Sequence, residues 1–449
     1  MMKQLFRNRI LIATCAMVAA LAATTLQSRA QGSFYVEAPK DGRIYVFNIM
    51  KVYEEWTKTG EMGKSITRIG AGPNGETLVF DSEEAIHLYN FRHGLPGEVI
   101  LKPEEKKAAV TNISWKDGKT TFEFEKGSIS IATTAQVRYT NEQPGDPNID
   151  SKGSFRIRRV KTKIDGWFYQ KWLGYELQIS FADPNNSILD DIAVNYDVTR
   201  GKKAFQIKAG QFKVPFGRQE LTSDGSQQFV DRSIVADEFE KSRDIGTQFW
   251  GQTPKGALEW RGGVFNGAGR NKTANDNSRF QYDARVTWQP WGDVKYSECD
   301  FESTTHPLVA FAAQYEKNDM HGATTGDDID REVYGGDVVF KFKGLSIFAE
   351  YFHRVSEPEI APEFRSDGFN AQIGYFVYKR NVEVALRYAT LDLSNLSGVS
   401  DDQRHEKGAA LNWFMNRHFL KLGADYRRLE NDLTGLTDDQ ARLQMQFIF

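Results

Sequence analysis

The sequence predicts an all-β fold: a transmembrane antiparallel β-barrel of about 16 strands, preceded by a small N-terminal α/β module. Three observations predict it. From residue 128 onward, apolar and polar side chains alternate with a period of two, which is typical of strands that have one apolar face. The connections between these runs alternate between tight turns and long polar loops. The first thirty residues have the pattern of an export signal.

Residues 1–30 are expected to be a cleaved signal peptide. Lys3, Arg7 and Arg9 precede an apolar run from Ile10 to Leu26, and Ser28-Arg29-Ala30 places small residues at the −3 and −1 positions of a cleavage site. An uncleaved membrane anchor is the alternative. Removing this segment takes four of the 57 Lys plus Arg and none of the 60 Asp plus Glu, so the net charge becomes −7. This balance does not favour a nucleic-acid binder.

Residues 31–126 are predicted to form a separate α/β module. They mix short apolar strands with two helical patterns at 48–59 and 82–93, and the second pattern begins with Ser82 as an N-cap before an acidic first turn. We expect this module on the side of the short turns, which is the periplasmic side of an outer-membrane barrel. A module that plugs the barrel lumen is the alternative.

Residues 127–449 are predicted to form the barrel. Sixteen alternating runs begin near residues 128, 154, 173, 189, 204, 243, 257, 280, 306, 332, 345, 365, 381, 405, 419 and 441. An even number of strands, with short turns on one rim and long loops on the other, is the arrangement of bacterial outer-membrane barrels. The linker at 291–305 breaks this rhythm, because a short turn is expected there. A soluble β-sandwich or solenoid is the alternative fold.

The residue types at the ends of the strands also indicate an outer-membrane location. Aromatic side chains recur near strand ends, as interfacial girdles require. The last strand alternates up to Phe449, which resembles the signal that the barrel-assembly machinery recognises. The expected surroundings are therefore outer-membrane lipids and lipopolysaccharide.

The sequence contains no pattern typical of an enzyme. Its seven His lack metal-ligand spacing, and no nucleophile elbow or HExxH motif is present. Cys299 is the only cysteine after the export signal, so no intramolecular disulfide is expected. We expect neither a metal nor a cofactor.

The segments GSFRIRRVKTK from residue 153, GQFKVPFGRQELTS at 210–223 and RDIG at 243–246 resemble the core of the phosphate-selective porin O and P family. The resemblance extends more loosely to residue 449, and residues 31–126 fall outside it. It implies a trimeric outer-membrane channel, with basic residues lining the pore for anions in some members. The alternation gives the strand count independently of this resemblance.

The segment at 215–242 is the longest loop of the predicted barrel. Pro215 and Gly217 end a strand there, and the loop is long enough to fold into the lumen and constrict it. Arg218 and Arg232 are its candidate constriction residues. A solvated external loop is the alternative.

Alternation assigns the side chains that face the lumen. The predicted wall holds twelve basic and eleven acidic residues, so it is nearly neutral, but basic residues concentrate where the last two strands meet the first two. Whether Arg159, Lys161 and Lys163 face inward depends on a β-bulge at 158–159. The alternative role for the arginines is to pair with loop acids and stiffen the wall. The candidate pore and anion-binding residues are Arg138, Arg156, Arg158, Lys161, Lys208, Lys421, Arg427 and Arg442.

Together these features predict a passive channel for small anions such as phosphate. Because the wall as a whole is nearly neutral, we expect only a modest preference for anions. The expected assembly is a homotrimer in the outer membrane. The alternatives are a porin for general solutes, and a barrel that mainly anchors the N-terminal module.

Overall fold

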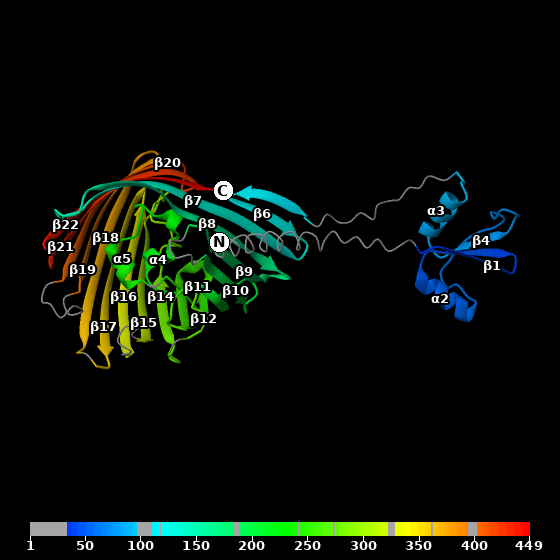
Figure 1. The fold of residues 1–449 in the computed structure, drawn as a ribbon, viewed down its shortest axis with the longest axis horizontal. Coiled ribbons are helices and arrows are strands. Elements are labelled where there is room, and N and C mark those ends of the chain that lie inside the picture. The colour runs from blue at the N-terminus through cyan, green and yellow to red at the C-terminus, as the bar shows by residue number, and fades with distance from the viewer. Residues whose placement is uncertain are drawn as a thin grey trace, which may run out of the picture. The chain divides into compact units, whose positions relative to one another are not determined.

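The computed structural model describes residues 34–96, 110–116, 118–182, 188–240, 242–272, 274–275, 277–321, 328–360, 362–393 and 402–449. The chain divides into two compact units, one up to Lys106 and the other from Lys107 onward. The first contains the α/β module and the second the barrel (Figure 1). The expected signal peptide, residues 1–30, lies outside the described residues. No helix in the described ranges is long and apolar enough to cross a membrane.

The N-terminal module is a four-stranded sheet in the order β1-β2-β4-β3, with β2 and β4 parallel. Phe47 packs against Tyr53 and Trp56 of one helix, while Phe80 packs against Tyr89 of the other. Neighbouring side chains of a strand point to opposite faces, and Phe80 is paired with Val46, so the two helices cover opposite faces of the sheet. The elements are β1 (Val36–Lys40), β2 (Arg43–Phe47), α2 (Met50–Thr59), β3 (Ile66–Arg68), β4 (Thr77–Phe80) and α3 (Glu83–Arg92).

The barrel is a closed antiparallel sheet of sixteen strands, β7 to β22, in which each strand pairs with its neighbours in sequence and β22 pairs with β7. Every alternating run predicted from the sequence is a strand. The strands are β7 (Gly127–Gln143), β8 (Lys152–Phe168), β9 (Gln170–Ser180), β10 (Leu189–Asp197), β11 (Gln206–Lys213), β12 (Arg243–Gln252), β13 (Leu258–Phe265), β14 (Gln281–Trp288), β15 (Leu308–His321), β16 (Asp328–Phe342), β17 (Leu345–Pro358), β18 (Phe364–Tyr378), β19 (Val382–Asp392), β20 (Gln403–Asn416), β21 (Leu420–Asn431) and β22 (Leu436–Ile448).

A hairpin formed by β5 (Asn112–Lys116) and β6 (Lys119–Phe124) extends this sheet. β22 pairs with β7 from Gln143 to Thr134, and β6 then pairs with β7 from Ile131 to Gly127, so β6 continues the line of β22. The hairpin therefore belongs to the barrel sheet, which begins before the predicted module boundary at residue 126. Two short strands that follow two helices could belong to either unit, because their local sequence pattern would be the same in both. The sequence therefore does not show whether this hairpin belongs to the module or to the barrel.

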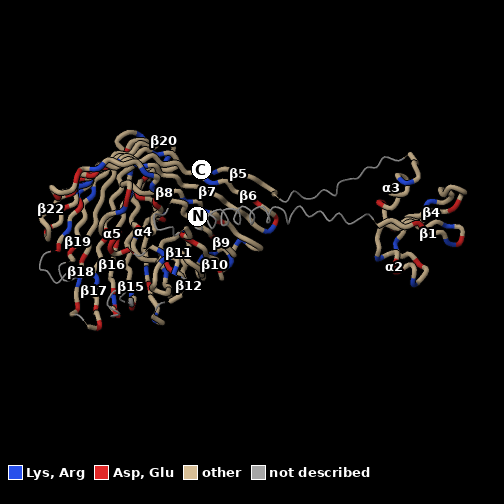
Figure 2. Tube along the Cα trace, viewed as in Figure 1, with Lys and Arg blue, Asp and Glu red and all other residues tan. Residues whose placement is uncertain are grey.

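Side chains alternate between the outside of the barrel and its lumen. On β14, Tyr282, Val286 and Trp288 are 48–54% exposed on the outer face, whereas Asp283 and Arg285 are buried on the inner face. Figure 2 shows acidic and basic residues interspersed along the barrel strands. This is the apolar-out, polar-in arrangement of an outer-membrane barrel.

Two predicted long loops are shorter than expected because strands extend into them. The segments 318–331 and 430–440 are largely parts of β15, β16, β21 and β22. Cross-strand ion pairs support these polar strand ends: Lys317 Nζ lies 2.9 Å from Asp330 Oδ2, and Arg428 Nε lies 3.0 Å from Asp439 Oδ1. Opposite charges facing each other across neighbouring strands stabilise the pairing.

Candidate functional site

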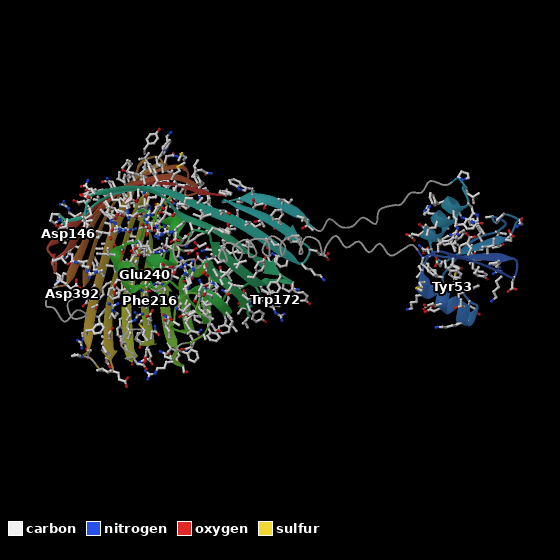
Figure 3. The ribbon with its side chains drawn as sticks, viewed as in Figure 1. Tyr53, Asp146, Trp172, Phe216, Glu240 and Asp392 are labelled. Atoms are coloured by element: carbon white, nitrogen blue, oxygen red, sulfur yellow. The ribbon has the colours of Figure 1, made fainter. Side chains whose placement is uncertain are left out.

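The connection between β11 and β12 lies inside the barrel in its described residues, 214–240 and 242. We call this connection the lumen loop. It contains α4 (Arg218–Leu221), the 3₁₀ turn η1 (Asp224–Ser226) and α5 (Ile234–Phe239). Figure 3 shows Phe216 and Glu240 among the barrel strands. The rings of Phe216 and Phe239 lie 5.5 and 5.4 Å from the ring of Phe352 on β17, between centroids. The loop thus fills part of the lumen instead of extending into solvent.

Pro215 and Gly217 turn the chain away from β11. Gly217 has φ +71°, a left-handed conformation that favours glycine, and a Cβ at this position would overlap the side chain of Glu240. Its backbone N–H donates to Gln314 Oε1 on β15 at 2.9 Å. These contacts hold the first turn of the lumen loop against the barrel wall.

The tip of the lumen loop reaches the seam where the barrel closes. Gln446 on β22 donates to the carbonyl oxygen of Gly225 at 2.9 Å, and Gln136 on β7 donates to that of Asp224 at 3.4 Å. Farther along, the Gln228 amide donates at 2.8 Å to both Ser346 on β17 and Glu383 on β19. The loop therefore crosses the lumen and is fixed on both sides.

The linker at 291–305, which broke the predicted rhythm, also enters the lumen. Glu298 Oε2 accepts from the backbone N–H of Gln228 at 2.6 Å, and Arg218 donates to the carbonyl oxygen of Val294 at 3.0 Å. Buried Cys299 and Phe301 pack with Phe376 and Phe414 of the wall. This insertion and the lumen loop together fill the lumen beside β15–β20.

Four arginines from the closing seam converge on Asp231 of the lumen loop. Arg138 forms an ion pair with it, and the guanidinium groups of Arg158, Arg159 and Arg442 lie 3.2, 3.2 and 3.3 Å from its carboxylate. Burial by itself raises the pKa of Asp231, but the charges of Arg159 and Arg138 outweigh burial and hold this pKa well below its usual value. The cluster is an anchor for the loop.

Lys421 and Arg442, two further predicted pore residues, take part in the same packing. Lys421 is buried and donates to the carbonyl oxygen of Gln227 at 2.8 Å, while Arg442 also holds Asp425 through two hydrogen bonds of 2.7 and 2.8 Å. Arg427 donates to Gln440 at 2.9 Å, and Arg156 is exposed. The structure therefore places Arg138, Lys421 and Arg442 behind the lumen loop.

One region of open space lies between the lumen loop and a wall formed mainly by β7 to β13. A cavity of about 410 Å³ lies in this space, and a smaller cavity of about 140 Å³ adjoins it. The two cavities share Arg159, Lys161, Asp224 and Arg243. The charged residues of the larger cavity are eight basic and three acidic: Lys119, Arg159, Lys161, Lys163, Lys208, Lys213, Arg243 and Arg261, with Glu176, Asp191 and Asp224. We call the two cavities together the basic slot.

A β-bulge brings most of the basic residues of β8 to the slot. Gln136 of β7 pairs with Arg159, but the next residue, Val137, pairs with Ile157, so Arg158 is the extra residue. Phe155 and Ile157 before the bulge are exposed on the outer face. After the bulge Arg159, Lys161 and Lys163 line the larger cavity, and Arg158 lines the smaller one. The bulge is needed because in a regular strand residues 155, 157, 159, 161 and 163 would all share one face.

Acidic side chains partly compensate the slot. Glu176 Oε2 accepts from Lys163 at 2.8 Å and Glu176 also pairs with Lys208. Asp191 Oδ1 accepts from Arg243 Nε at 2.8 Å. Asp165, Asp190, Glu220 and Glu259, which do not line the larger cavity, also pair with Lys119, Lys161, Lys213 and Arg261. The excess of eight basic over three acidic side chains is therefore a property of the cavity lining alone.

Sequence reasoning missed several residues of the slot: Lys213, Arg243, Arg261 and Asp224. Alternation along its strand also predicts that Arg261 faces the lumen, but Arg261 is not among the candidate anion-binding residues. Lys213 lies at the end of a strand and Asp224 on the loop, where alternation assigns no face. Arg243 belongs to the RDIG motif, which was a signal for it. In the described parts of the chain, no three His, Cys, Asp or Glu side chains are arranged to hold a metal ion.

The closed sixteen-stranded barrel with a loop folded into its lumen is the architecture of an outer-membrane porin, a channel. The model of the phosphate-selective porin O and P family matches residues 131–449, and the chain belongs to that family.

One protein is similar to this chain in sequence, and two solved structures are similar to it in fold. An uncharacterized protein of Aquifex aeolicus (strain VF5) is 23% identical, covering 81% of this chain and 97% of its own. The solved structure of the anion-selective porin from Comamonas acidovorans has a TM-score of 0.53 at 13% identity, over 72% of this chain and 100% of that one. The outer membrane channel DcaP of Acinetobacter baumannii has a TM-score of 0.53 at 11% identity, over 72% and 98%.

Proposed function

We propose that this porin conducts small anions, phosphate among them, through the basic slot. The observation that carries the proposal is the lining of the slot, in which basic side chains outnumber acidic ones by eight to three in the larger cavity. A passive channel needs sites that attract an ion but release it readily, and a row of partly compensated Lys and Arg meets both needs. The selectivity of the porin from Comamonas acidovorans supports an anionic permeant.

The permeating anion would meet Lys and Arg in succession. It would enter the smaller cavity beside Arg158 and Arg270, pass Arg159 and Lys161, and continue along Lys163 and Lys208 of the larger one. Guanidinium groups offer forked donors to oxyanions, and they are less tightly hydrated than ammonium groups. At physiological ionic strength, charges farther away than about 8 Å are largely screened, so the slot outweighs the balanced wall as a whole.

The proposal extends to the cellular setting. The barrel would lie among outer-membrane lipids and lipopolysaccharide as a homotrimer. Residues 1–30 would direct export and then be cleaved, and the N-terminal module would lie in the periplasm. The barrel-assembly machinery would recognise the last strand. Its Phe449 is 62% exposed while its backbone pairs with Thr133, which leaves the side chain accessible to that machinery.

A general-solute porin is the second candidate, because Glu176, Asp191 and Asp224 each pair with basic neighbours and reduce the surplus. The reversal potential of the purified full chain in a planar bilayer under a KCl gradient distinguishes the two. We expect it to shift toward the chloride equilibrium potential, and phosphate to block the chloride current. A reversal potential near zero, together with passage of uncharged sugars in liposome swelling, would favour the general-solute porin.

A further inference from the structure

An acidic side chain lies at the junction of the two cavities of the basic slot. Arg159, Lys161, Asp224 and Arg243 line both cavities, so a solute that moves between the cavities passes these four side chains. Three of them are basic and favour an anion. Asp224 is the exception, and it comes from the tip of the lumen loop and not from the wall.

Asp224 occupies the position where a permeating anion would bind. Its Oδ2 lies 2.8 Å from Lys161 Nζ and 3.3 Å from Arg159 Nε, while its Oδ1 lies 2.8 Å from Arg232 Nη2. Two cations from β8 and one from the lumen loop thus surround one carboxylate. A carboxylate and the oxygens of phosphate use the same Lys and Arg donors.

The carboxylate is held in place by its backbone. Ser223 caps the short turn η1 by accepting from the N–H of Gly225. Gln136 and Gln446 donate to the carbonyl oxygens of Asp224 and Gly225. Because the loop tip is anchored to β7 and β22, the side chain of Asp224 stays between the two cavities.

Asp224 is also charged at neutral pH. Burial by itself raises its pKa, but the charges of Arg159, Arg232 and Lys161 outweigh burial and hold the pKa well below its usual value. The group therefore competes as an anion.

We propose that Asp224 is a tethered competitor: its carboxylate occupies the cationic clamp formed by Arg159, Lys161 and Arg232, and permeating oxyanions must exchange with it. This inference rests on the proposed anion conduction and specifies how it is regulated. The competitor weakens the hold of the clamp on each anion, so that oxyanions pass instead of remaining bound.

Asp231, seven residues farther along the same loop, shows the contrast. It too is surrounded by arginines, but it lines neither cavity of the slot. Its role is to anchor the loop, whereas Asp224 lies on the path itself.

The test compares Asp224→Asn with the wild-type full chain in planar bilayers, by reversal potential in a KCl gradient and by phosphate block of the chloride current. We expect the chloride-to-potassium permeability ratio of the variant to rise about fivefold, the factor that one unit charge imposes at about 4 Å in a water-like medium. The phosphate concentration for half block should fall by at least the same factor. Asp224→Glu keeps the charge and should remain close to the wild type.

A matched control is Asp337→Asn. Asp337 on β16 faces the lumen and lies 2.7 Å from Arg285, but it lines neither cavity of the slot. Its neutral variant should leave the permeability ratio nearly unchanged. Asp224→Ser serves as a second variant if the asparagine variant does not yield a folded barrel, because it removes the carboxylate with a smaller side chain.

The outcomes separate this inference from the proposed function. A wild type that prefers cations would overturn both. An anion-selective wild type whose Asp224→Asn and Asp224→Ser variants keep the same selectivity and phosphate block would overturn the competitor alone. The competitor is also overturned if Asp337→Asn shifts the ratio as much, or if conductance rises for both ions without a change in selectivity, since that result indicates a loosened loop.

Discussion

Replacing Asp231 by asparagine should release the lumen loop from the barrel wall. The substitution removes the charge that four guanidinium groups share, and Arg138 and Arg442 among them have side chains only 0% and 2% exposed. Removing one partner of a buried ion pair costs about 3–5 kcal/mol. The low end applies here, because Arg138 keeps Gln444 and Arg442 keeps Asp425 as partners.

A loss of about 3 kcal/mol lowers the ratio of docked to undocked loop about 100-fold, since each 1.4 kcal/mol is tenfold. The barrel should stay folded, because its strands are closed by backbone hydrogen bonds that do not involve the loop. We therefore expect larger and noisier single-channel conductance for Asp231→Asn in planar bilayers. Asp150→Asn, on an exposed position between β7 and β8, is the control. A folded Asp231→Asn barrel with wild-type conductance and noise would refute the anchoring role.

Three further changes test the loop and the domain organisation. Gly217→Ala should also raise conductance noise, because the new Cβ would overlap the Glu240 side chain in a left-handed backbone. Recordings of this variant that are as quiet as those of the wild type would contradict the prediction. Burial, and then the charges of Glu350 and Glu220, raise the pKa of Glu240 well above its usual value. The folded chain therefore keeps a proton on Glu240 that the unfolded chain loses above about pH 4.5. As a result, the free energy of unfolding falls as the pH rises. Glu240→Gln should reduce the loss of thermal stability between pH 5 and pH 8, measured by the gel shift of the heated barrel; an equal loss in both proteins would disprove it. A chain that begins at Lys107 should fold and conduct like the full chain, because the module is a separate compact unit; failure to fold would show that the barrel needs it.

The barrel could be predicted from the sequence because its signal repeats at every strand. Alternation on strands such as β14 reflects an apolar exterior and a polar lumen, and this constraint acts on each side chain separately. The hairpin β5–β6 follows the same alternation, but it is too short to be distinguished from a strand pair of the module. Local patterns therefore identified the strands but not the unit to which the shortest ones belong.

The site was predictable only in part. Arg158, Lys161 and Lys208 line the basic slot. Arg138, Lys421 and Arg442 face the same lumen but lie against the lumen loop. Alternation assigns a face, but it cannot say which part of a lumen is filled by a distant segment. The bulge at Arg158 and the path of the linker at 291–305 depend on tertiary packing, and the position of Asp224 depends on where the loop tip meets β7 and β22.

Conduction through the basic slot is tested most directly by the reversal potential of Lys161→Glu beside that of the wild type, in planar bilayers under a KCl gradient. Lys161 lies at the junction of the two cavities, 2.8 Å from Asp224 and 3.1 Å from Asp190, so the substitution reverses a charge on the proposed path. Lys171→Glu, at an exposed position beside the turn between β8 and β9, is the matched control. If anions pass through the basic slot, the reversal potentials of the wild type and the control will lie toward the chloride equilibrium potential. The reversal potential of Lys161→Glu will lie closer to the potassium equilibrium potential. Equal reversal potentials for all three proteins would show that ions take another path.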